Sequence, residues 1–377
     1  MEEKKDYSTT LNLPQTDLSY CFYNSSFSSL SAIENLLTRV SSITNLDYCF
    51  YRTTVDSLNV LNEINMGANS TMNYTFAECP NIRTLSNITI SRNVTSVEGM
   101  FKGCPLTSIS NITVNVSGSI KGLFMGCGQL TTINTFRIPN VTDLSNVFSG
   151  CSNLTTLIGF ELPSSVTNIS NLFNGCYALT TIENFTFSNN ITEANTWYPP
   201  YLETLQNITI NSSAVKLTNC TTLTTIRDFT LGTNDCSSMF EGCTSLTSDI
   251  ELPSTIVNCS NMFKNCTSIT NVHSNWDNVY DNEITATGCY GGCTAITHID
   301  EVALELNDYT SGLDQVPMAW GGYEFTKEIT GLYKVNIPSD NYTLNFDPNS
   351  KGFLTSNGVI NWGDGTITIG ETSHIYT

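Results

Sequence analysis

The chain has few charged residues, and basic residues are especially scarce. Only 13% of its 377 residues are Asp, Glu, Lys or Arg, and 34 acidic residues outnumber 15 basic ones to give a formal net charge of −19. Proteins bind nucleic acids and anionic membranes through clusters of Lys and Arg. The shortage of these residues therefore argues against a nucleic-acid partner, and Ser, Thr and Asn are left to supply much of the surface.

Long apolar runs and histidines are also scarce. No stretch of about 18 apolar residues is present, so we expect no membrane insertion. The first residues are charged and no apolar segment follows them, so no signal peptide is expected. The three histidines (His273, His298 and His374) lie in no nucleophile or metal motif, and no phosphate-binding glycine loop with its lysine occurs. We therefore expect no enzymatic activity, no metal and no cofactor.

The chain instead contains a phenylalanine followed three positions later by a cysteine, repeated through most of its length. The clearest copies begin at Phe76, Phe101, Phe124, Phe148, Phe173, Phe240 and Phe263. Degenerate marks lie at Phe22, Phe50, Trp197, Leu217 and Tyr290. The period is about 24 residues, within the range of roughly 20–29 for leucine-rich repeats. This self-similarity predicts a repeat solenoid of about twelve repeats, in which each repeat stacks on its neighbours.

Each repeat is expected to combine one short strand with a compact turn. After the cysteine, apolar residues follow at gaps of three, three and two, as in Leu130, Ile133, Phe136 and Ile138. Residues two apart share one face of a strand, so Phe136 and Ile138 are expected inward and Arg137 outward. A short α- or 3₁₀-helical segment ending near Phe148 completes the predicted repeat, and Gly150 suits a left-handed cap after it.

Stacking aligns the outward strand residues of successive repeats into a band of Thr and Asn with few charges. The candidate binding face consists of Asn87, Thr89, Asn111, Thr113, Arg137, Glu161, Asn184, Thr186, Asn207, Thr209, Asp228, Thr230 and Glu251. Two interpretations stay open. These side chains either make an ordinary hydrophilic sheet surface or form a hydrogen-bonding surface that contacts a protein or a carbohydrate.

Fourteen cysteines are present, and nine of them occupy the fixed position after the repeat mark. A free cysteine behaves as a small buried hydrophobe, so one cysteine per repeat predicts a ladder of reduced thiols in the core. Neighbouring repeats are close enough for disulfides, which stay the alternative. A linear ladder does not supply the tetrahedral ligands of a zinc site.

The repeat from Leu154 to Cys176 resembles BspA-like leucine-rich repeats, also called the Treponema pallidum type, in its strand, Pro163, Val-Thr pair and Phe-x-x-Cys ending. Residues 141–148 are also similar to a bacterial surface repeat of low-GC Gram-positive and mycoplasma proteins. The resemblance covers roughly residues 18–300. It implies a surface protein, extracellular or on the cell surface, that binds host proteins or other cells.

A different style of sequence follows the repeats. We expect residues 1–17 to be a cap or a disordered leader, 18–300 the solenoid, 301–330 an irregular connector and 331–377 a small all-β module. Trp362 with the Gly-Asp-Gly-Thr sequence that follows it, and His374 with Tyr376, resemble PKD-like β-sandwich domains. The closing strand of that family is absent, so the sandwich is expected to be incomplete, with an open edge that docks into a larger assembly.

The sequence therefore favours a non-enzymatic binding or adhesion protein, whose sheet face recognises a protein or glycan on another cell or surface. An alternative hypothesis is a structural or receptor-binding component of a phage virion, suggested by the missing signal and the C-terminal module. A second alternative is an intracellular protein-interaction scaffold.

Overall fold

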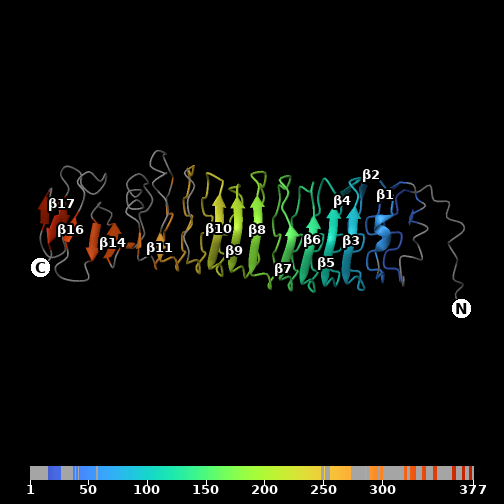
Figure 1. Ribbon diagram of the computed structural model, residues 1–377, viewed down its shortest axis with the longest axis horizontal. Coiled ribbons are helices and arrows are strands. Elements are labelled where there is room, and N and C mark those ends of the chain that lie inside the picture. Colours follow the sequence, from blue (N-terminus) through green and yellow to red (C-terminus); the bar gives the residue numbers. More distant parts are fainter. Residues whose placement is uncertain are drawn as a thin grey trace. The chain divides into compact units, whose positions relative to one another are not determined.

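The computed structural model describes residues 16–26, 37–38, 40, 42–56, 58–247, 250, 255–272, 285 and 288–295, together with the backbone of short strands between 298 and 375 (Figure 1). The chain divides into two compact units. The first unit comprises residues 1–180 and 184–200, and the second comprises residues 181–183 and 201–377. Each unit is described by itself.

The first unit is built of parallel strands, one after another along the chain. They are β1 (Ile43–Asn45), β2 (Met66–Thr71), β3 (Thr84–Ile90), β4 (Val94–Ser96), β5 (Ser108–Val114), β6 (Thr132–Arg137), β7 (Thr156–Phe160) and most of β8 (Thr181–Phe187), with a 3₁₀ helix, η2 (Asn59–Asn62), between β1 and β2. Strands β3, β5, β6 and β7 form one parallel sheet in that order, and β1, β2 and β4 form another. Figure 1 shows β3, β5, β6 and β7 in succession from blue to green.

Equivalent residues of successive repeats pair directly in this sheet. Leu85 pairs with Ile109, Ile109 with Ile133, and Ile133 with Leu157. Leu85, Ile109 and Ile133 are buried, and Leu157 is half-buried. Along β3 and β5, exposed or half-buried residues separate the buried ones. Stacked parallel strands with one repeat per coil confirm the predicted leucine-rich-repeat-like solenoid.

The second unit contains two kinds of strand pairing. Strands β9 (Thr204–Ile210) and β10 (Thr225–Leu231) are parallel, as are β11 (Asn271–Val272) and β12 (His298–Ile299). Later strands pair antiparallel: β13 (Met318–Trp320), β14 (Tyr323–Lys327) and β15 (Tyr333–Asn336) in one sheet, β16 (Thr343–Asn345) with β19 (Ser373–Ile375), and β17 (Val359–Asn361) with β18 (Ile367–Ile369). Strands β13 and β14 lie within the segment expected as a connector. The domain boundaries, the PKD-like assignment and the docking role stay predictions.

The phenylalanines of the repeat marks form a stack inside the first unit. Rings of Phe50, Phe76, Phe101, Phe124, Phe148 and Phe173 follow one another at centroid distances of 5.2–6.0 Å. Rings from the sheet meet this stack edge-on, as Phe136 meets Phe124 at 5.5 Å. Aromatic pairs of these kinds contribute about 0.5–1.5 kcal/mol each beyond their buried area. The core therefore lies between the sheet and the segment that carries the marks.

The segment expected as a short helix is not a helix. The N–H groups of Leu144, Asn146, Phe148 and Gly150 donate to carbonyls of the next coil at 2.7–3.1 Å, and only the alternate N–H groups bond three residues back. Half of the donors are thus committed to the neighbouring coil, which interrupts any helical series. We call the residues equivalent to 144–151 in each coil the turn ribbon. Outside η2 and residues 37–38, the described residues contain no helix.

The glycine predicted as a left-handed cap has that conformation. Gly150 and Gly175 have φ of 78° and 76°, and Gly242 has 78°. The same backbone conformation recurs four residues earlier in the ribbon, where Asn146 has φ of 60°. Left-handed residues reverse the local winding at both positions. The ribbon therefore combines right-handed and left-handed turns, which is the second reason that it forms no helix.

The cysteines are free, and all except Cys21 are buried. Of the nine thiols that follow a repeat mark, Cys220 donates to the carbonyl oxygen of Leu202 at an Sγ–O distance of 3.8 Å. The other eight donate to the carbonyl oxygen of the marked residue in the preceding coil, at Sγ–O distances of 3.0–3.2 Å. We call this series the Cys ladder: Cys79, Cys104, Cys127, Cys151 and Cys176 in the first unit, and Cys243, Cys266 and Cys293 in the second. The prediction of reduced core thiols is confirmed. The thiol is selected because it is small, apolar and still able to donate.

Candidate binding surface

The outward residues of the predicted binding face line up as expected within the sheet of the first unit. Thr89 pairs with Thr113, and Thr113 pairs with Arg137. Thr89 and Arg137 are exposed, and Thr113 is half-buried. Their side chains repeat at the strand spacing of about 4.8 Å. We call these residues, with the outward residues beside them, the sheet face.

The asparagine column of this face has a backbone cause that the alternation pattern did not predict. Asn87, Asn111 and Asn184 have φ of 56°, 52° and 62°, and the equivalent Thr135 and Gly159 have 61° and 63°. Asn, Asp and Gly tolerate this left-handed conformation best. The bend it introduces exposes two consecutive residues in the middle of the strand and produces the three-residue apolar gap. The backbone thus accounts for Asn and Gly in this column but does not explain Thr135.

The amides of this column also contact one another. Asn111 Nδ2 donates to Asn87 Oδ1 at 2.8 Å. In the second unit, Asn207 and Asp228 occupy the same left-handed position with φ of 50° and 49°. The column therefore has a structural role in both units, whatever else it contacts.

The remaining predicted residues lie where the repeat pattern places them. In the first unit Glu161 follows β7, and Thr186 lies on β8, and both are exposed. In the second unit Thr209 pairs with Thr230. Glu251 lies outside the described residues. The structure therefore assembles the predicted band separately within each unit.

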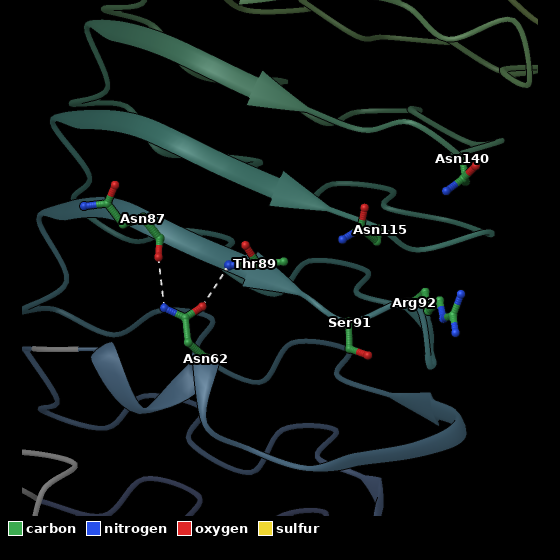
Figure 2. Close-up of a pocket in the computed structure, with 7 residues that line it drawn as sticks. All are labelled: Asn62, Asn87, Thr89, Ser91, Arg92, Asn115 and Asn140. Atoms are coloured by element: carbon green, nitrogen blue, oxygen red, sulfur yellow. Dashed lines mark hydrogen bonds between the residues drawn. The ribbon is translucent and has the colours of Figure 1, made fainter.

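An open groove of about 700 Å³ lies at one end of the sheet face, as Figure 2 shows. Its lining consists of Asn62, Asn87, Thr89, Ser91, Arg92, Asn115 and Asn140. Asn115 and Asn140 follow the ends of β5 and β6, beside the end of β3. Arg92 is exposed and is the only charged residue in the lining. The groove thus offers neutral hydrogen-bonding groups and a single cation.

The groove exists because η2 takes the place of a strand beside β3. Asn62, at the end of η2, donates from Nδ2 to the carbonyl oxygen of Asn87 at 2.9 Å and accepts from the N–H of Thr89 at 2.9 Å. Figure 2 shows this amide lying against the edge of β3. One side chain therefore imitates the hydrogen bonds of a neighbouring strand. It closes a sheet edge that would otherwise present unpaired backbone groups.

The described part of the chain contains no obvious site for metal chemistry. No group of three or more His, Cys, Asp or Glu side chains there is placed to hold a metal ion. No helix among those residues is long and apolar enough to cross a membrane.

The sequence of the repeats identifies the family. The family model described as a BspA type leucine-rich repeat region matches residues 9–131, 69–205 and 121–234, which together cover more than half of the chain. The chain belongs to the BspA-type leucine-rich repeat family. A second model, described as a Mycoplasma protein of unknown function, matches residues 224–297.

Three solved structures are similar to this BspA-type chain. One from Bacteroides ovatus is 17% identical with a TM-score of 0.38, over 75% of this chain and 82% of that one. A leucine-rich cell surface protein from Faecalibacterium prausnitzii is 16% identical with a TM-score of 0.23, over 66% and 84%. A leucine-rich repeat protein from T. pallidum is 16% identical with a TM-score of 0.24, over 57% and 81%. No curated protein matches the chain.

Only part of the groove in this BspA-type protein was predicted from its sequence. Asn87 and Thr89 were predicted as binding-face residues, but Asn62, Arg92 and Asn115 were not. The apolar spacing around Asn62, at Leu58, Leu61, Ile64 and Met66, is the same as in other repeats. No pattern in the sequence therefore distinguishes the coil in which a 3₁₀ helix replaces the strand.

Proposed function

We propose that this BspA-type chain is a non-enzymatic recognition protein of the cell surface or extracellular space, which binds a protein or glycan on another cell or surface. Membership of a leucine-rich repeat family supports a binding role, because stacked repeats present extended faces to partners. The adhesive function and the location follow from the family resemblance of the repeats.

The observation that carries the proposal is the sheet face of the first unit. Thr89 and Thr113 are aligned in register, with Arg137 next in the column, and few charges interrupt this face. Neutral hydroxyl and amide groups lose less hydration free energy on contact than charged groups do. Such a face is suited to partners that present hydroxyl or peptide groups.

The groove extends this face and adds selectivity. Asn115 and Asn140 each carry an amide that can donate and accept, and Arg92 can bind a carboxylate with two parallel hydrogen bonds. A glycan or a polypeptide with an acidic group would satisfy all three side chains. The described groove is therefore the part of the sheet face in which we expect the tightest contacts.

The test is a binding screen with two matched variants. The full chain is applied to a glycan array and to purified extracellular-matrix proteins, beside the double variant Thr89→Arg with Asn140→Arg. Both replaced residues are exposed and line the groove. The control, Asn153→Arg with Asn174→Arg, adds the same charge at exposed positions off the sheet.

We expect a ligand that binds the native chain and the control but loses about tenfold in affinity with the groove variant, as when one or two good contacts are removed. If a ligand bound all three proteins with equal affinity, its binding site would lie away from the sheet face. Catalytic turnover of any bound glycan would contradict the non-enzymatic assignment.

A further inference from the structure

A cluster of five tyrosines lies on the turn ribbon of the first coils. Tyr20 stacks on Tyr48 at a centroid distance of 5.0 Å, Tyr48 on Tyr74 at 4.9 Å, and Tyr23 on Tyr51 at 5.0 Å. The two columns meet at 5.8 Å between Tyr20 and Tyr23 and at 5.7 Å between Tyr48 and Tyr51. We call these five residues the tyrosine cluster. Tyr20 is 56% exposed and Tyr23 is 44% exposed, so the cluster reaches solvent.

The backbone conformation disfavours the tyrosines of the first column. Tyr20, Tyr48 and Tyr74 have φ of 56°, 55° and 52°. In the following coils the same position, two residues before the repeat mark, is occupied by Gly99, Gly122, Asn146 and Asn171, with φ of 57–62°. A left-handed conformation costs most side chains about 1–2 kcal/mol, but it costs glycine nothing and asparagine little. Local structure thus favours Gly or Asn at all seven positions and does not explain the tyrosines.

The core does not explain them either. In these coils the buried aromatic residues are those at the repeat marks, such as Phe50 and Phe76, and the tyrosines lie on the outer side of the same ribbon. Stacking between the rings contributes about 0.5–1.5 kcal/mol per pair, which only offsets the cost of the backbone conformation. Non-glycine residues held in the left-handed region at a solvent-facing site are a recognised sign of function.

The ring positions are fixed by their neighbours. An added side chain at Gly99 would clash with the ring of Tyr74, so this glycine leaves room for the end of the first column. Arg52 lies over the ring of Tyr51 at 5.2 Å, and Lys102 lies over the ring of Tyr74 at 5.9 Å. Arg52 also pairs with Glu78, with Nε and Oε2 2.6 Å apart. The cluster is therefore rigid before any partner arrives.

The tyrosine cluster is separate from the sheet face. Across the core, Phe124 of the ribbon meets Phe136 of the sheet, so ribbon and sheet are the two walls of one coil. Their exposed side chains point away from the core on different sides. A ligand on the sheet face leaves the cluster open.

We propose that the tyrosine cluster is a docking site for a second protein, independent of the sheet-face function proposed above. The partner is a polypeptide surface because the rings stack face to face and present mainly their edges and hydroxyls. A sugar that packs on aromatic faces would find the faces within each column covered by the next ring. Ring edges and hydroxyls instead suit backbone carbonyls, amides and apolar side chains.

The composition and rigidity of the cluster favour the same partner. Tyr and Arg are the residue types enriched at the energetic centres of protein interfaces. Preordered rings lose little conformational entropy on binding, which raises affinity for a given contact area. Five tyrosines with Arg52 form such a centre on a chain that is otherwise dominated by Ser, Thr and Asn.

The test uses a variant that the fold already accommodates. In the triple variant Tyr20→Asn, Tyr48→Asn and Tyr74→Asn, each tyrosine is replaced by the residue found at Asn146 and Asn171, which adopts the same backbone conformation. The control is Tyr177→Asn with Tyr201→Asn, two tyrosines that are 56% and 52% exposed elsewhere. The probe is a displayed library of random peptides, selected on the native full chain, and thermal melting checks that each variant is folded.

We expect the selected peptides to lose at least about tenfold in affinity for the triple variant and to keep their affinity for the control. Equal affinity for all three proteins would overturn the proposal. The assignment to a separate protein partner is wrong if the triple variant loses affinity only for glycans. It is also wrong if the triple variant loses only the association of two copies of this chain, measured by light scattering.

A second readout needs no variant. Saturating selected peptide is expected to protect Tyr20 and Tyr23 of the native chain from nitration while Tyr177 and Tyr201 react as before. Unchanged nitration of Tyr20 and Tyr23 in the presence of bound peptide would place the docking site elsewhere and overturn the proposal.

Discussion

Among the columns of left-handed residues in the first unit, one on the sheet and one on the turn ribbon differ in their side chains. The sheet column contains Asn87, Asn111, Thr135 and Gly159, which are mostly residues that the backbone conformation favours. The ribbon column begins with Tyr20, Tyr48 and Tyr74 and only then changes to Gly and Asn. The same conformational requirement therefore explains one column and fails to explain the start of the other. A residue that resists its local backbone preference is better evidence of function than one that obeys it.

The largest expected effect concerns the buried thiols of the Cys ladder in both units. Burial raises the pKa of Cys176, Cys243 and Cys293 to about 12, whereas a thiol in the unfolded chain ionises near pH 9. The folded state therefore holds protons that the unfolded state releases above that pH. Stability is present below about pH 9 and falls as pH rises toward 12, by up to about 1.4 kcal/mol per pH unit for each thiol.

Urea unfolding at pH 7, 8, 9 and 10 checks this prediction. We expect similar free energies of unfolding at pH 7 and 8 and a steep fall between pH 9 and 10. Equal values at pH 7 and pH 10 would mean that the thiols are not buried as a ladder.

The next effect tests whether left-handed positions of the ribbon tolerate only suitable residues. Gly150 has φ of 78°, and a Cβ there would lie 3.4 Å from the Cα of Gly126 in the neighbouring coil. The change Gly150→Val is expected to lower the free energy of unfolding by about 2–4 kcal/mol, from backbone strain and crowding together. Urea unfolding measures it, with Asn174→Val at an exposed ribbon position as the control. If the Gly150→Val protein were as stable as the control, the left-handed conformation would not restrict the residue type in the ribbon. The comparison between the sheet column and the ribbon column would then have no basis.

A smaller effect tests why the ribbon carries a cysteine and not an alkyl residue. The Cys151 thiol donates to the carbonyl oxygen of Phe124 at 3.2 Å. Cys151→Val keeps an apolar side chain but removes one of two donors to that carbonyl, which still accepts from the N–H of Cys127 at 3.1 Å. We therefore expect a loss of about 0.5–1.5 kcal/mol. The same variant should also show a weaker alkaline fall in stability, because one ionising thiol is gone. Stability equal to that of the native chain would reduce the thiol to a space-filling role.

The sequence predicted the features that repeat in every coil. The mark phenylalanines, the buried cysteines and the left-handed Gly150 all follow from residue type and spacing within one repeat. The ribbon was wrongly predicted as helical because its decisive hydrogen bonds, such as Phe148 N–H to the carbonyl of Leu172, join different coils. A single repeat contains no sign of them.

The candidate sites were harder to predict because they depend on departures from the repeat. The groove needs the amide of Asn62 against β3, although the apolar spacing around it is ordinary. Four of the five tyrosines lie in the coils of the degenerate marks Phe22 and Phe50, and only the φ values reveal the conflict between residue and backbone. Sequence pattern therefore gave the scaffold, whereas the places where individual coils differ required the structure.

A reciprocal exchange between the two columns tests the central claim most directly. The free energy of unfolding is measured for Tyr74→Asn and for Asn111→Tyr, beside the native chain. Tyr74 stacks on one ring, that of Tyr48. Tyr74→Asn should change stability by less than about 1 kcal/mol, because relief of backbone strain offsets the loss of that one stacked pair. Asn111→Tyr should lower stability by about 1–2 kcal/mol, since it adds that strain and removes the hydrogen bond to Asn87. If Tyr74→Asn were the more damaging change, the tyrosines would be needed for folding, and the distinction between the two columns would be contradicted.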